Sequence, residues 1–309
     1  MLDGFEVRKT IAEEALLGLR RPQKSLPSKL FYDEEGCRLF GEITRLPEYY
    51  PTRTETALLR AIGPDLPKHS FAALIEYGAS DETKAELVLP HLTVDAYIPI
   101  DVAGAALEAI VDRMSVRHAG LRVLPLACDF LAPLDLPAGV PHGRNFGFFP
   151  GSTIGNLDRP VASAFLTSVA MTLGPQASFL VGVDLRKDRS VLIPAYDDAQ
   201  GITAAFNLNI LAHLNHAAGA DFDLANFIHR ARWNDEASRI EMHLECRRDH
   251  DVTLGGERIR FRRGETIHTE NSYKYTVAGF QSLAFEAGWT AGRVWVDDRN
   301  LFSVHLLTR

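Results

Sequence analysis

An alternation of short apolar runs with amphipathic helical segments begins near residue 71, and it constrains the fold more than any other feature of the chain. Helical patterns occupy residues 81–92 and 103–118, between runs that have the length and composition of strands buried on both faces. The predicted strands are residues 71–78, 94–102, 121–130, 144–151 and 177–185. Strands that alternate with helices in this way predict an α/β domain with a parallel, doubly wound sheet.

Doubly wound sheets bind ligands beyond the carboxyl ends of their strands, so the residues at those ends are candidate site residues. The first strand ends in residues 76–80, where Gly78 allows the backbone to approach a ligand closely. The second ends in Asp101, 23 residues after Gly78, which is the spacing of an acid that binds a ribose diol. The third ends in Asp129 and Phe130, a carboxylate beside a ring suited to bracketing an adenine.

Each of these residues also has a simpler explanation, because Gly78 would suit a tight turn and either acid would suit a helix N-cap. Their occurrence in order at three successive strand ends nevertheless favours an adenosine-containing ligand. A nicotinamide dehydrogenase would carry G-x-G-x-x-G after the first strand, and this motif is absent from the sequence.

The C-terminal stretch indicates which adenosine-containing ligand is bound. Residues 275–288 have an amphipathic helical pattern that ends in glycine, a usual helix stop. Residues 292–298 and 300–309 are two strand-like runs joined by a tight Asp-Arg-Asn turn. A helix followed by a terminal hairpin is the ending of the class I S-adenosylmethionine-dependent methyltransferase fold, a Rossmann-like sheet whose last strand inserts antiparallel. This ending predicts S-adenosyl-L-methionine as the co-substrate.

Residues 188–274 are too many for a loop between the fifth strand and the final helix. They contain a helical pattern at residues 207–219 and a strand-like run at residues 238–248. We therefore expect an inserted α+β domain that, together with residues 1–55, binds the substrate and forms a lid. The S-adenosylmethionine-binding domain is then expected to comprise residues 56–187 and 275–309.

Composition and charge restrict the class of partner. The chain has 309 residues, of which 46% are hydrophobic and 24% charged, and its net charge of −7 gives no basic footprint for nucleic acid or an anionic membrane. No apolar run approaches the ~20 residues of a membrane span, and the N-terminus lacks the apolar core of a secretory signal. Three widely separated cysteines suit a reducing cytoplasm. We expect a cytoplasmic monomer that acts on a small molecule.

Long motifs from most of the chain resemble one family. They are residues 25–55 (SLPSKLFYDEEGCRLFGEITRLPEYYPTRTE), 148–157 (FFPGSTIGNL), 195–209 (AYDDAQGITAAFNLN), 222–234 (FDLANFIHRARWN), 239–245 (RIEMHLE) and 269–275 (TENSYKY). In these motifs the sequence resembles the ergothioneine-pathway L-histidine Nα-methyltransferases almost residue by residue. The resemblance implies a methyltransferase fold with an extra substrate domain. It also implies three methyl transfers that convert L-histidine to hercynine, the first step of ergothioneine biosynthesis.

The resemblance also implies roles for residues of the substrate pocket. Tyr49 is similar to the catalytic tyrosine that faces the substrate amine, and Tyr32 to its neighbour in the pocket. Asn156 and Tyr196 are similar to the pair that holds the substrate carboxylate. Gly151 falls beside them as a further substrate-binding position.

Residues 268–275 contain the positions that the family uses to read the imidazole. By resemblance Glu270 and Ser272 are the imidazole readers, and Met242 packs beside the ring. If residues 268–275 form a strand, period-two alternation places Glu270, Ser272 and Lys274 on one face. The simpler interpretation is an edge strand whose polar face is solvated.

On the donor side, the resemblance places Gly78, Lys84, Asp101, Asp129 and Phe130 at contacts with S-adenosylmethionine.

One departure concerns the turn after the first strand. The family usually has Gly-Ser-Gly there, whereas this chain has Gly78-Ala79-Ser80. A serine at a position that requires φ > 0 would be strained by ~1 kcal/mol or more. Two alternatives therefore stay open beside the histidine enzyme: an Nα-methyltransferase for another amino acid or amine, and a degenerate module that binds S-adenosylmethionine poorly and lacks activity.

Two further motifs suggest sites that we do not expect. His213 and His216 have the H-x-x-H spacing of zinc ligands, but no cysteine or acid completes a closed site, so a solvated helix face is favoured and no metal is expected. Residues 151–155 loosely resemble a phosphate loop but lack the following Lys-Ser/Thr, which argues against a nucleoside triphosphate.

Overall fold

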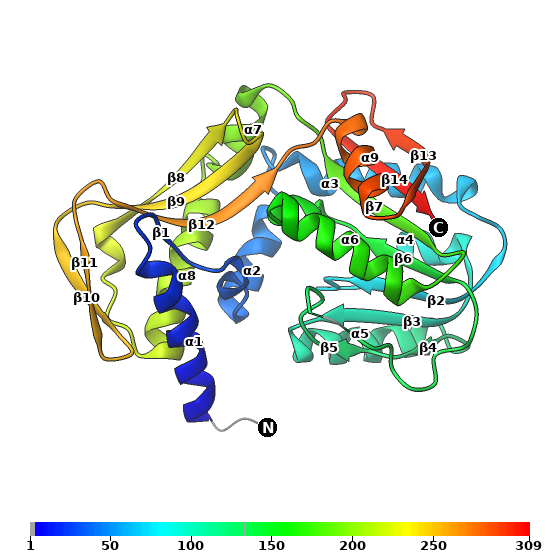
Figure 1. Ribbon diagram of the computed structural model, residues 1–309, viewed down its shortest axis with the longest axis horizontal. Helices are drawn as coiled ribbons and strands as arrows, with labels where there is room; N and C mark the ends of the chain where they lie inside the picture. Colours follow the sequence, from blue (N-terminus) through cyan, green and yellow to red (C-terminus); the bar gives the residue numbers. More distant parts are fainter. Residues whose placement is uncertain (1–3, 133) are drawn as a thin grey trace. The chain divides into compact units, whose positions relative to one another are not determined.

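The computed structural model describes residues 4–132 and 134–309, and the chain divides into two compact units (Figure 1). Unit 1 comprises Met1–Tyr50 and Lys187–Ser272, and unit 2 comprises Pro51–Arg186 and Tyr273–Arg309. The boundaries expected from the sequence lie one to five residues further along the chain than these. The largest difference arises because the helix α3 (Tyr50–Ile62) continues through residue 55.

Unit 2 is built on an eight-stranded mixed sheet with the order β13-β14-β7-β6-β2-β3-β4, and β5 also pairs with β3. The strands are β2 (Ser70–Tyr77), β3 (Thr93–Asp101), β4 (Arg122–Val123), β5 (Leu126–Ala127), β6 (Asn145–Phe149), β7 (Ser178–Asp184), β13 (Thr290–Val296) and β14 (Phe302–Thr308). Strands β3, β2, β6 and β7 run parallel, and β14 is antiparallel to both β7 and β13. This strand order confirms the predicted class I methyltransferase fold. From β2 the chain first adds strands on one side, β3 and then β4, and afterwards adds β6 and β7 on the other side, so the topological switch point lies between β2 and β6.

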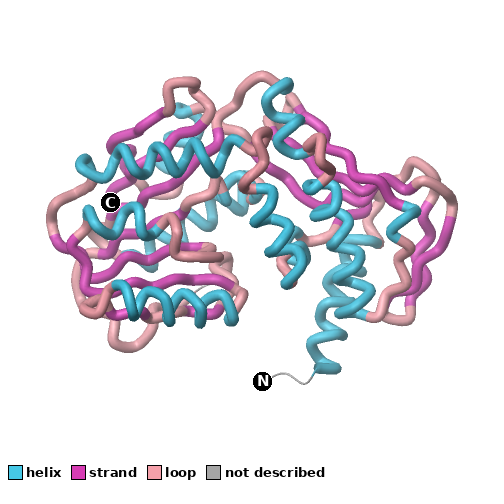
Figure 2. The backbone as a smooth tube through the Cα atoms, turned by 180° about the vertical axis from the view of Figure 1, so that it is seen from behind, coloured by secondary structure: helices cyan, strands magenta, loops and turns pink. Residues whose placement is uncertain are grey.

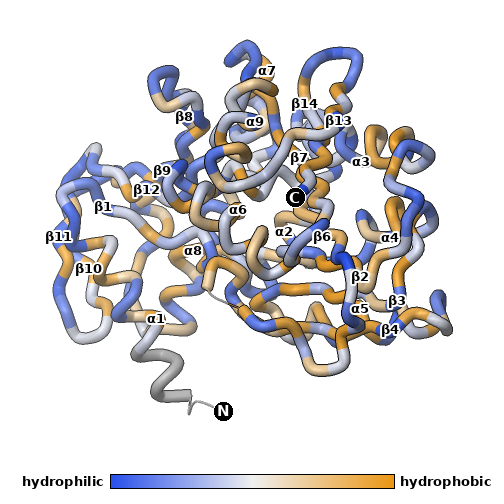
Figure 3. The backbone as a smooth tube through the Cα atoms, turned by 45° about the vertical axis from the view of Figure 1, so that its right-hand side comes forward, coloured by the Kyte–Doolittle hydropathy of each residue, from blue (hydrophilic) through white to orange (hydrophobic). Residues whose placement is uncertain are grey.

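Helices cover both faces of this sheet (Figure 2). They are α3, α4 (Ala85–Val88), α5 (Gly104–Arg117), α6 (Arg159–Leu173) and α9 (Val277–Glu286), with 3-10 turns η2 (Gly63–Asp65), η3 (Leu89–His91) and η4 (Thr153–Asn156). Helices α3, α4 and α5 share one core with Leu74, Phe146 and Leu180. On the other face, the ring of Phe165 in α6 lies 4.6 Å from that of Phe149. Two covered faces explain why β2, β6 and β7 read as continuous apolar runs (Figure 3).

Two predicted elements are shorter than expected, and a proline accounts for each. The predicted strand 121–130 is two short strands, β4 and β5, because Pro125 between them has no N–H to donate to the ladder. The predicted helix 81–92 is reduced to α4 and the turn η3, since Pro90 cannot supply the next intrahelical hydrogen bond.

The C-terminal hairpin has a longer connection than the predicted three-residue turn. Residues 297–301 join β13 to β14, and the Asp297 carboxylate accepts the backbone N–H groups of Arg299, Leu301 and Phe302 at 2.7–2.9 Å. Asn300 adopts a left-handed conformation with φ of 53°.

Unit 1 combines a four-stranded sheet, in the order β1-β12-β9-β8, with the separate hairpin β10-β11. Its elements are α1 (Gly4–Leu19), β1 (Lys24–Ser25), η1 (Ser28–Phe31), α2 (Glu34–Ile43), α7 (Arg189–Tyr196), α8 (Ile202–Ala218), η5 (Leu224–Asn226), β8 (Phe227–Asn234), β9 (Arg239–Cys246), β10 (His250–Leu254), β11 (Glu257–Phe261) and β12 (Thr266–Tyr273). Helix α8 packs against β8 and β9. Its Phe206 ring stacks on Phe31 at 4.5 Å between centroids.

No helix within residues 4–132 and 134–309 combines the length and apolarity that crossing a bilayer requires.

The strand predicted at residues 268–275 is β12, but it ends before Lys274. Lys274 belongs to unit 2, where its Nζ lies 2.6 Å from Oδ2 of Asp184 and both side chains are fully buried. Lys274 lies beyond the end of β12, so it does not share a strand face with Glu270 and Ser272, and its charge is neutralised at the end of β7.

We predict that Asp184→Asn lowers the free energy of unfolding by ~3–5 kcal/mol, because it leaves a buried ammonium without its counter-charge. Removing both charges with Asp184→Leu and Lys274→Met should cost less. Urea unfolding measures both variants. Arg248→Gln is the control, because it removes an ion pair whose side chains are 68% and 54% exposed and should leave the midpoint unchanged. Equal losses in the single and double variants would contradict this explanation.

Candidate active site

The turn after β2 contains the residues expected to approach the methyl donor. Gly78 has a φ of +74°, a conformation that favours glycine. The N–H groups of Gly78 and Ala79 both point at the Ile100 carbonyl, at 2.8 and 3.0 Å. Ala79 is fully buried in the apolar core of unit 2. Ser80 does not adopt a positive φ, so the Gly-Ala-Ser sequence fits this turn without the strain considered above.

The end of the third predicted strand contacts this turn. A Cβ built on Gly78 would lie 3.6 Å from Cε1 of Phe130. The half-buried Phe130 ring is held edge-on against Phe149 and Phe165, with centroids 5.6 and 5.5 Å away. Asp129 is exposed, and its Oδ1 accepts the N–H of the second residue after it at 2.9 Å. The structure thus brings Gly78 and Phe130 into direct contact.

Asp101 is half-buried at the end of β3. Its Oδ1 accepts the N–H of Ala103 at 2.8 Å, one residue before α5 begins. Burial raises the pKa of Asp101, and the N–H groups of Ala103 and Val102 act in the opposite direction. Asp101 is therefore not the N-cap of α5, which is Ala103, although its carboxylate accepts a hydrogen bond in the turn before the helix. The N–H groups of Ala103 and Val102 occupy only part of the acceptor capacity of a carboxylate.

Lys84 is held by a residue to which the sequence analysis gave no role. Its Nζ lies 2.7 Å from Oε2 of Glu55, whose side chain is 1% exposed. The N–H of Gly151 reaches both Glu55 oxygens, at 2.8 and 2.9 Å. A Cβ on Gly182 would collide with Oε1 of Glu55, so a glycine in β7 is what admits this carboxylate. Glu55 closes the motif 25–55, and no local pattern marks it as a partner of Lys84.

Glu76 adds a second buried acid at the end of β2. The Tyr97 hydroxyl donates to its Oε2 at 2.5 Å. Burial raises the pKa of Glu76 to about 8, against the effects of the Tyr97 hydrogen bond and the Lys84 charge.

The turn after β6 positions Gly151 and Asn156. Gly151 and Ser152 are both left-handed, with φ of 82° and 56°. The conformation of Ser152 is stabilised because its Oγ accepts the N–H of Asp184 at 2.8 Å. The turn η4 then ends at the half-buried Asn156.

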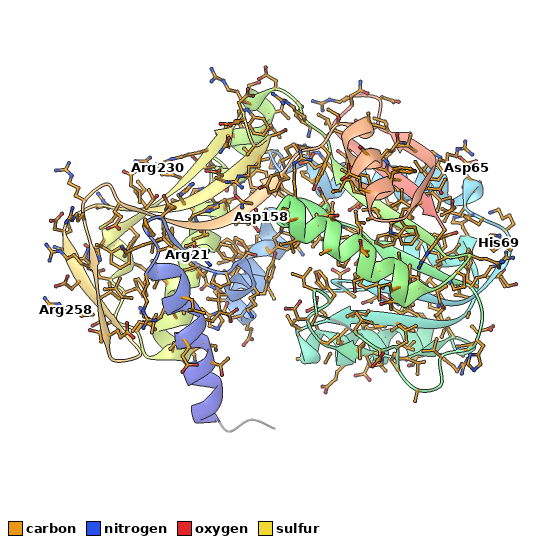
Figure 4. All side chains as sticks on the ribbon, in the orientation of Figure 1. Arg21, Asp65, His69, Asp158, Arg230 and Arg258 are labelled. Carbon is orange, nitrogen blue, oxygen red and sulfur yellow. The ribbon has the colours of Figure 1, made fainter. Side chains whose placement is uncertain are left out.

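The segment that follows Asn156 is tied to the C-terminal part of unit 2. Asp158, labelled in Figure 4 before α6, accepts the Tyr273 hydroxyl at 3.1 Å. A Cβ on Gly155 would come within 2.8 Å of the Tyr273 carbonyl oxygen, so these two backbones pack closely.

In unit 1, aromatic rings connect three of the expected substrate residues. Tyr32 and Tyr49 both pack edge-on against Phe40, with centroids 6.1 and 6.3 Å away. The Tyr49 ring is also edge-on to Tyr196, at 6.2 Å. Tyr32 is 39% exposed whereas Tyr196 is 8% exposed, so the row runs from the surface of unit 1 into its interior.

Ser272 joins this row through its side chain, because the Tyr196 hydroxyl and Ser272 Oγ are 2.7 Å apart. Met242 is buried on β9, and its carbonyl oxygen lies 3.0 Å from the Thr269 hydroxyl, so it adjoins the same part of β12. The structure therefore gathers Tyr32, Tyr49, Tyr196 and Ser272 in one connected group.

Glu270 and Asn271 of β12 are both half-buried, whereas Ser272 is buried. Nε2 of His268 lies 3.0 Å from the Glu270 carbonyl oxygen, so the backbone of this stretch is also held by a side chain of its own strand. The placement of Glu270 and Ser272 on one face of β12 stays a prediction.

The candidate residues divide between the two units. Unit 2 contains Gly78, Ala79, Ser80, Lys84, Asp101, Asp129, Phe130, Gly151 and Asn156, and unit 1 contains Tyr32, Tyr49, Tyr196, Met242, Glu270 and Ser272. The two histidines of H-x-x-H differ in environment: Nδ1 of His213 lies 2.7 Å from the Leu30 carbonyl oxygen, and His216 is exposed. Among the described residues, no three acids, histidines or cysteines are grouped as metal ligands.

Comparison with known proteins agrees with this architecture. Residues 11–309 match the model of the family described as histidine-specific, SAM-dependent methyltransferases. The chain is 38% identical to histidine N-alpha-methyltransferase from Mycolicibacterium smegmatis, over 97% of this chain and 95% of that protein. It is also 38% identical to the protein of that name from Mycobacterium tuberculosis, over 94% and 92%.

A more distant relative is ergothioneine biosynthesis protein 1 from Schizosaccharomyces pombe, which is 30% identical over 81% of this chain and 34% of that longer protein. A family model that matches nearly the whole chain, together with relatives aligned end to end, settles the assignment. The chain belongs to the family of S-adenosylmethionine-dependent, histidine-specific methyltransferases.

Proposed function

We propose that this protein uses S-adenosyl-L-methionine to methylate the α-amino group of L-histidine three times, which gives hercynine and begins ergothioneine biosynthesis. The observation that carries this proposal is the end-to-end match to the mycobacterial histidine N-alpha-methyltransferases. The connected group of Tyr49, Tyr196 and Ser272 in unit 1 supports it, because a small zwitterion needs several polar contacts held in fixed positions.

Unit 2 has groups that suit the donor. The Gly78 backbone carries no Cβ at the switch point between β2 and β6, and the half-buried Phe130 ring adjoins it. Asp101 retains acceptor capacity for a ribose diol. We therefore assign donor binding to unit 2, through Gly78, Ala79, Ser80, Lys84, Asp101, Asp129 and Phe130.

We assign recognition of the amino acid to the residues that the resemblance implies, which are Tyr32, Tyr49, Gly151, Asn156, Tyr196, Met242, Glu270 and Ser272. In this proposal Asn156 and Tyr196 bind the substrate carboxylate, Glu270 and Ser272 read the imidazole, and Met242 packs beside the ring. A neutral imidazole has one N–H and one bare nitrogen, so a carboxylate and a hydroxyl together match it.

S-adenosylmethionine supplies a methyl group on a sulfonium, and the thioether that leaves needs no acid. The task of the protein is orientation, which can supply ~7–11 kcal/mol of the barrier. Tyr49 orients the lone pair of the substrate amine, which loses its proton to water before each transfer. Anchors at the carboxylate and the imidazole leave the nitrogen free to rotate between transfers.

We also propose that the protein acts as a cytoplasmic monomer without a metal. Cys128 and Cys246 form no disulfide, as a reducing compartment favours.

Incubation with S-adenosylmethionine and each of twenty amino acids, followed by mass detection of mono-, di- and trimethylated products, tests the function. Trimethylation of histidine alone supports the proposal, and products from another amino acid instead of histidine overturn it.

Calorimetric titration with S-adenosylhomocysteine addresses the Gly-Ala-Ser turn. No binding at about 1 mM would identify a degenerate donor site.

We predict that Glu270→Ala weakens histidine binding by ~1.5–3 kcal/mol, the usual scale for a hydrogen bond to a charged group. Affinity for S-adenosylhomocysteine should stay nearly constant. Calorimetry measures both ligands. Glu245→Ala is the matched control, because it removes a carboxylate of the same sheet that lies 3.3 Å from Arg230 and should leave histidine affinity unchanged. Retained histidine affinity in Glu270→Ala would show that Glu270 does not read the imidazole.

We predict that Tyr49→Phe lowers turnover by ~10–100-fold, because the amine loses the hydroxyl that orients its lone pair. Donor affinity should change little, since Tyr49 belongs to unit 1. Single-turnover kinetics with histidine, together with S-adenosylhomocysteine titration, measure the two effects. Unchanged turnover would remove the proposed role of Tyr49.

A further inference from the structure

Unit 1 contains a group of buried polar side chains to which the proposed reaction gives no direct role. Asn207 of α8, His229 of β8 and Thr269 of β12 are 0%, 5% and 2% exposed. They are joined by hydrogen bonds between elements that are far apart in the chain. Buried polar groups are costly unless satisfied, so their arrangement is strongly constrained.

The orientation of the Asn207 amide follows from its partners. Nδ2 lies 3.1 Å from the His243 carbonyl oxygen, which accepts only, so this atom must be the amide nitrogen. Oδ1 accepts the Thr269 hydroxyl at 2.7 Å. The same Nδ2 lies 2.8 Å from Nδ1 of His229. Asn207 therefore donates to His229 and to the His243 carbonyl while it accepts from Thr269.

The tautomer of His229 is then fixed. Nδ1 faces the amide donor of Asn207 and must be bare. Nε2 lies 2.8 Å from the Tyr196 carbonyl oxygen and must carry the proton. His229 is thus a neutral imidazole that donates to the last residue of α7.

These bonds lead to the residues proposed to recognise the amino acid. His229 satisfies the terminal carbonyl of α7 and so fixes the backbone of Tyr196, whose hydroxyl bonds Ser272. Thr269 precedes Glu270, and its single hydroxyl proton goes to Asn207 Oδ1 at 2.7 Å, the shorter of its two acceptor contacts. One amide, that of Asn207, therefore connects the supports of Tyr196 and β12.

We propose that Asn207 and His229 are positioning residues that hold Tyr196 and β12 in the arrangement required to bind the substrate amino acid, without contacting it themselves. This inference rests on the proposed function. The donor–acceptor order Thr269, Asn207, His229, Tyr196 is what enforces the arrangement, because reversing any one group leaves two donors or two acceptors face to face.

The electrostatic surroundings of His229 favour its neutral form. Burial lowers the pKa of His229, the Tyr196 carbonyl and the Asp197 and Asp198 carboxylates act in the opposite direction, and the Arg230 guanidinium lowers it further. Arg230 is the next residue of β8 and is labelled in Figure 4.

Asn207→Asp tests the proposal by reversing one donor. The introduced carboxylate has no proton to give, so a neutral His229 can donate either to this carboxylate or to the Tyr196 carbonyl but not to both, whereas the imidazolium donates to both. The carboxylate raises the pKa of His229 in the folded variant, so the two bonds are present together at low pH and one of them is lost as the pH rises through that pKa. We expect the ratio of variant to wild-type Kd for histidine to rise ~10-fold between about pH 6 and about pH 8.5. The Kd for S-adenosylhomocysteine should be unchanged.

Two further variants separate this role from general destabilisation. Asn215→Asp makes the same chemical change in the same helix, where the amide bonds only the backbone of Phe222, at 2.8 Å in both directions. It should lower the Tm without changing histidine affinity or its pH dependence. Adding His229→Gln to Asn207→Asp should abolish the pH dependence, because glutamine does not titrate. Persistence of the pH dependence in that double variant would overturn the proposal.

Thr269→Val is an independent test should Asn207→Asp fail to fold, because valine keeps the shape of threonine and removes the hydroxyl. Histidine affinity should fall ~3–10-fold at constant donor affinity, and unchanged histidine affinity would overturn the proposal.

Nitrogen NMR of the wild-type protein reports the His229 tautomer without any substrate. A bare Nδ1 with no binding of histidine would refute the proposed function alone. Binding of histidine with a protonated Nδ1 would refute the positioning network alone.

Discussion

The ion pair between the buried carboxylate of Glu55 and Lys84 is the interaction on which the carboxyl edge of the unit 2 sheet depends. A buried charge is tolerated only when it is paired and hydrogen-bonded, and Glu55 meets both conditions through Lys84 and the Gly151 N–H. These partners come from the segment before α4 and from the turn after β6, while Glu55 itself lies in α3. One charge therefore fixes three segments at the carboxyl edge of the sheet, where the winding reverses.

In unit 1, neutral hydrogen-bonding groups rather than a buried charge hold segments that are far apart in the chain. Asn207 connects α8 to β8, β9 and β12 with one amide, and His229 extends the connection to the end of α7. Neutral hydrogen bonds avoid the desolvation cost of a buried charge, yet their donor–acceptor order is equally specific. The two units thus reach fixed geometry by different electrostatic means.

The parallel strands of unit 2 could be predicted from the sequence because burial on both faces leaves a continuous apolar signal in β2, β6 and β7. The role of Glu55 could not be predicted from the sequence, because its partner Gly151 is 96 residues away and no local pattern links a helical glutamate to a turn glycine. The same holds for Asn207, whose side chain bonds Thr269, 62 residues later in the chain. Candidate positions came from strand ends and motifs, whereas the groups that hold them came only from tertiary contacts.

The Gly-Ala-Ser turn shows why a departure from a family motif must be judged by backbone conformation. Only Gly78 in this turn adopts a positive φ, and it has kept its glycine. Ala79 replaces the usual serine with a smaller apolar side chain at a fully buried position, where an unpartnered hydroxyl would be costly. Ser80 occupies a conformation open to any L-residue. The departure therefore conserves the one backbone requirement of the turn, and it changes the side chains at positions 79 and 80 rather than the path of the chain.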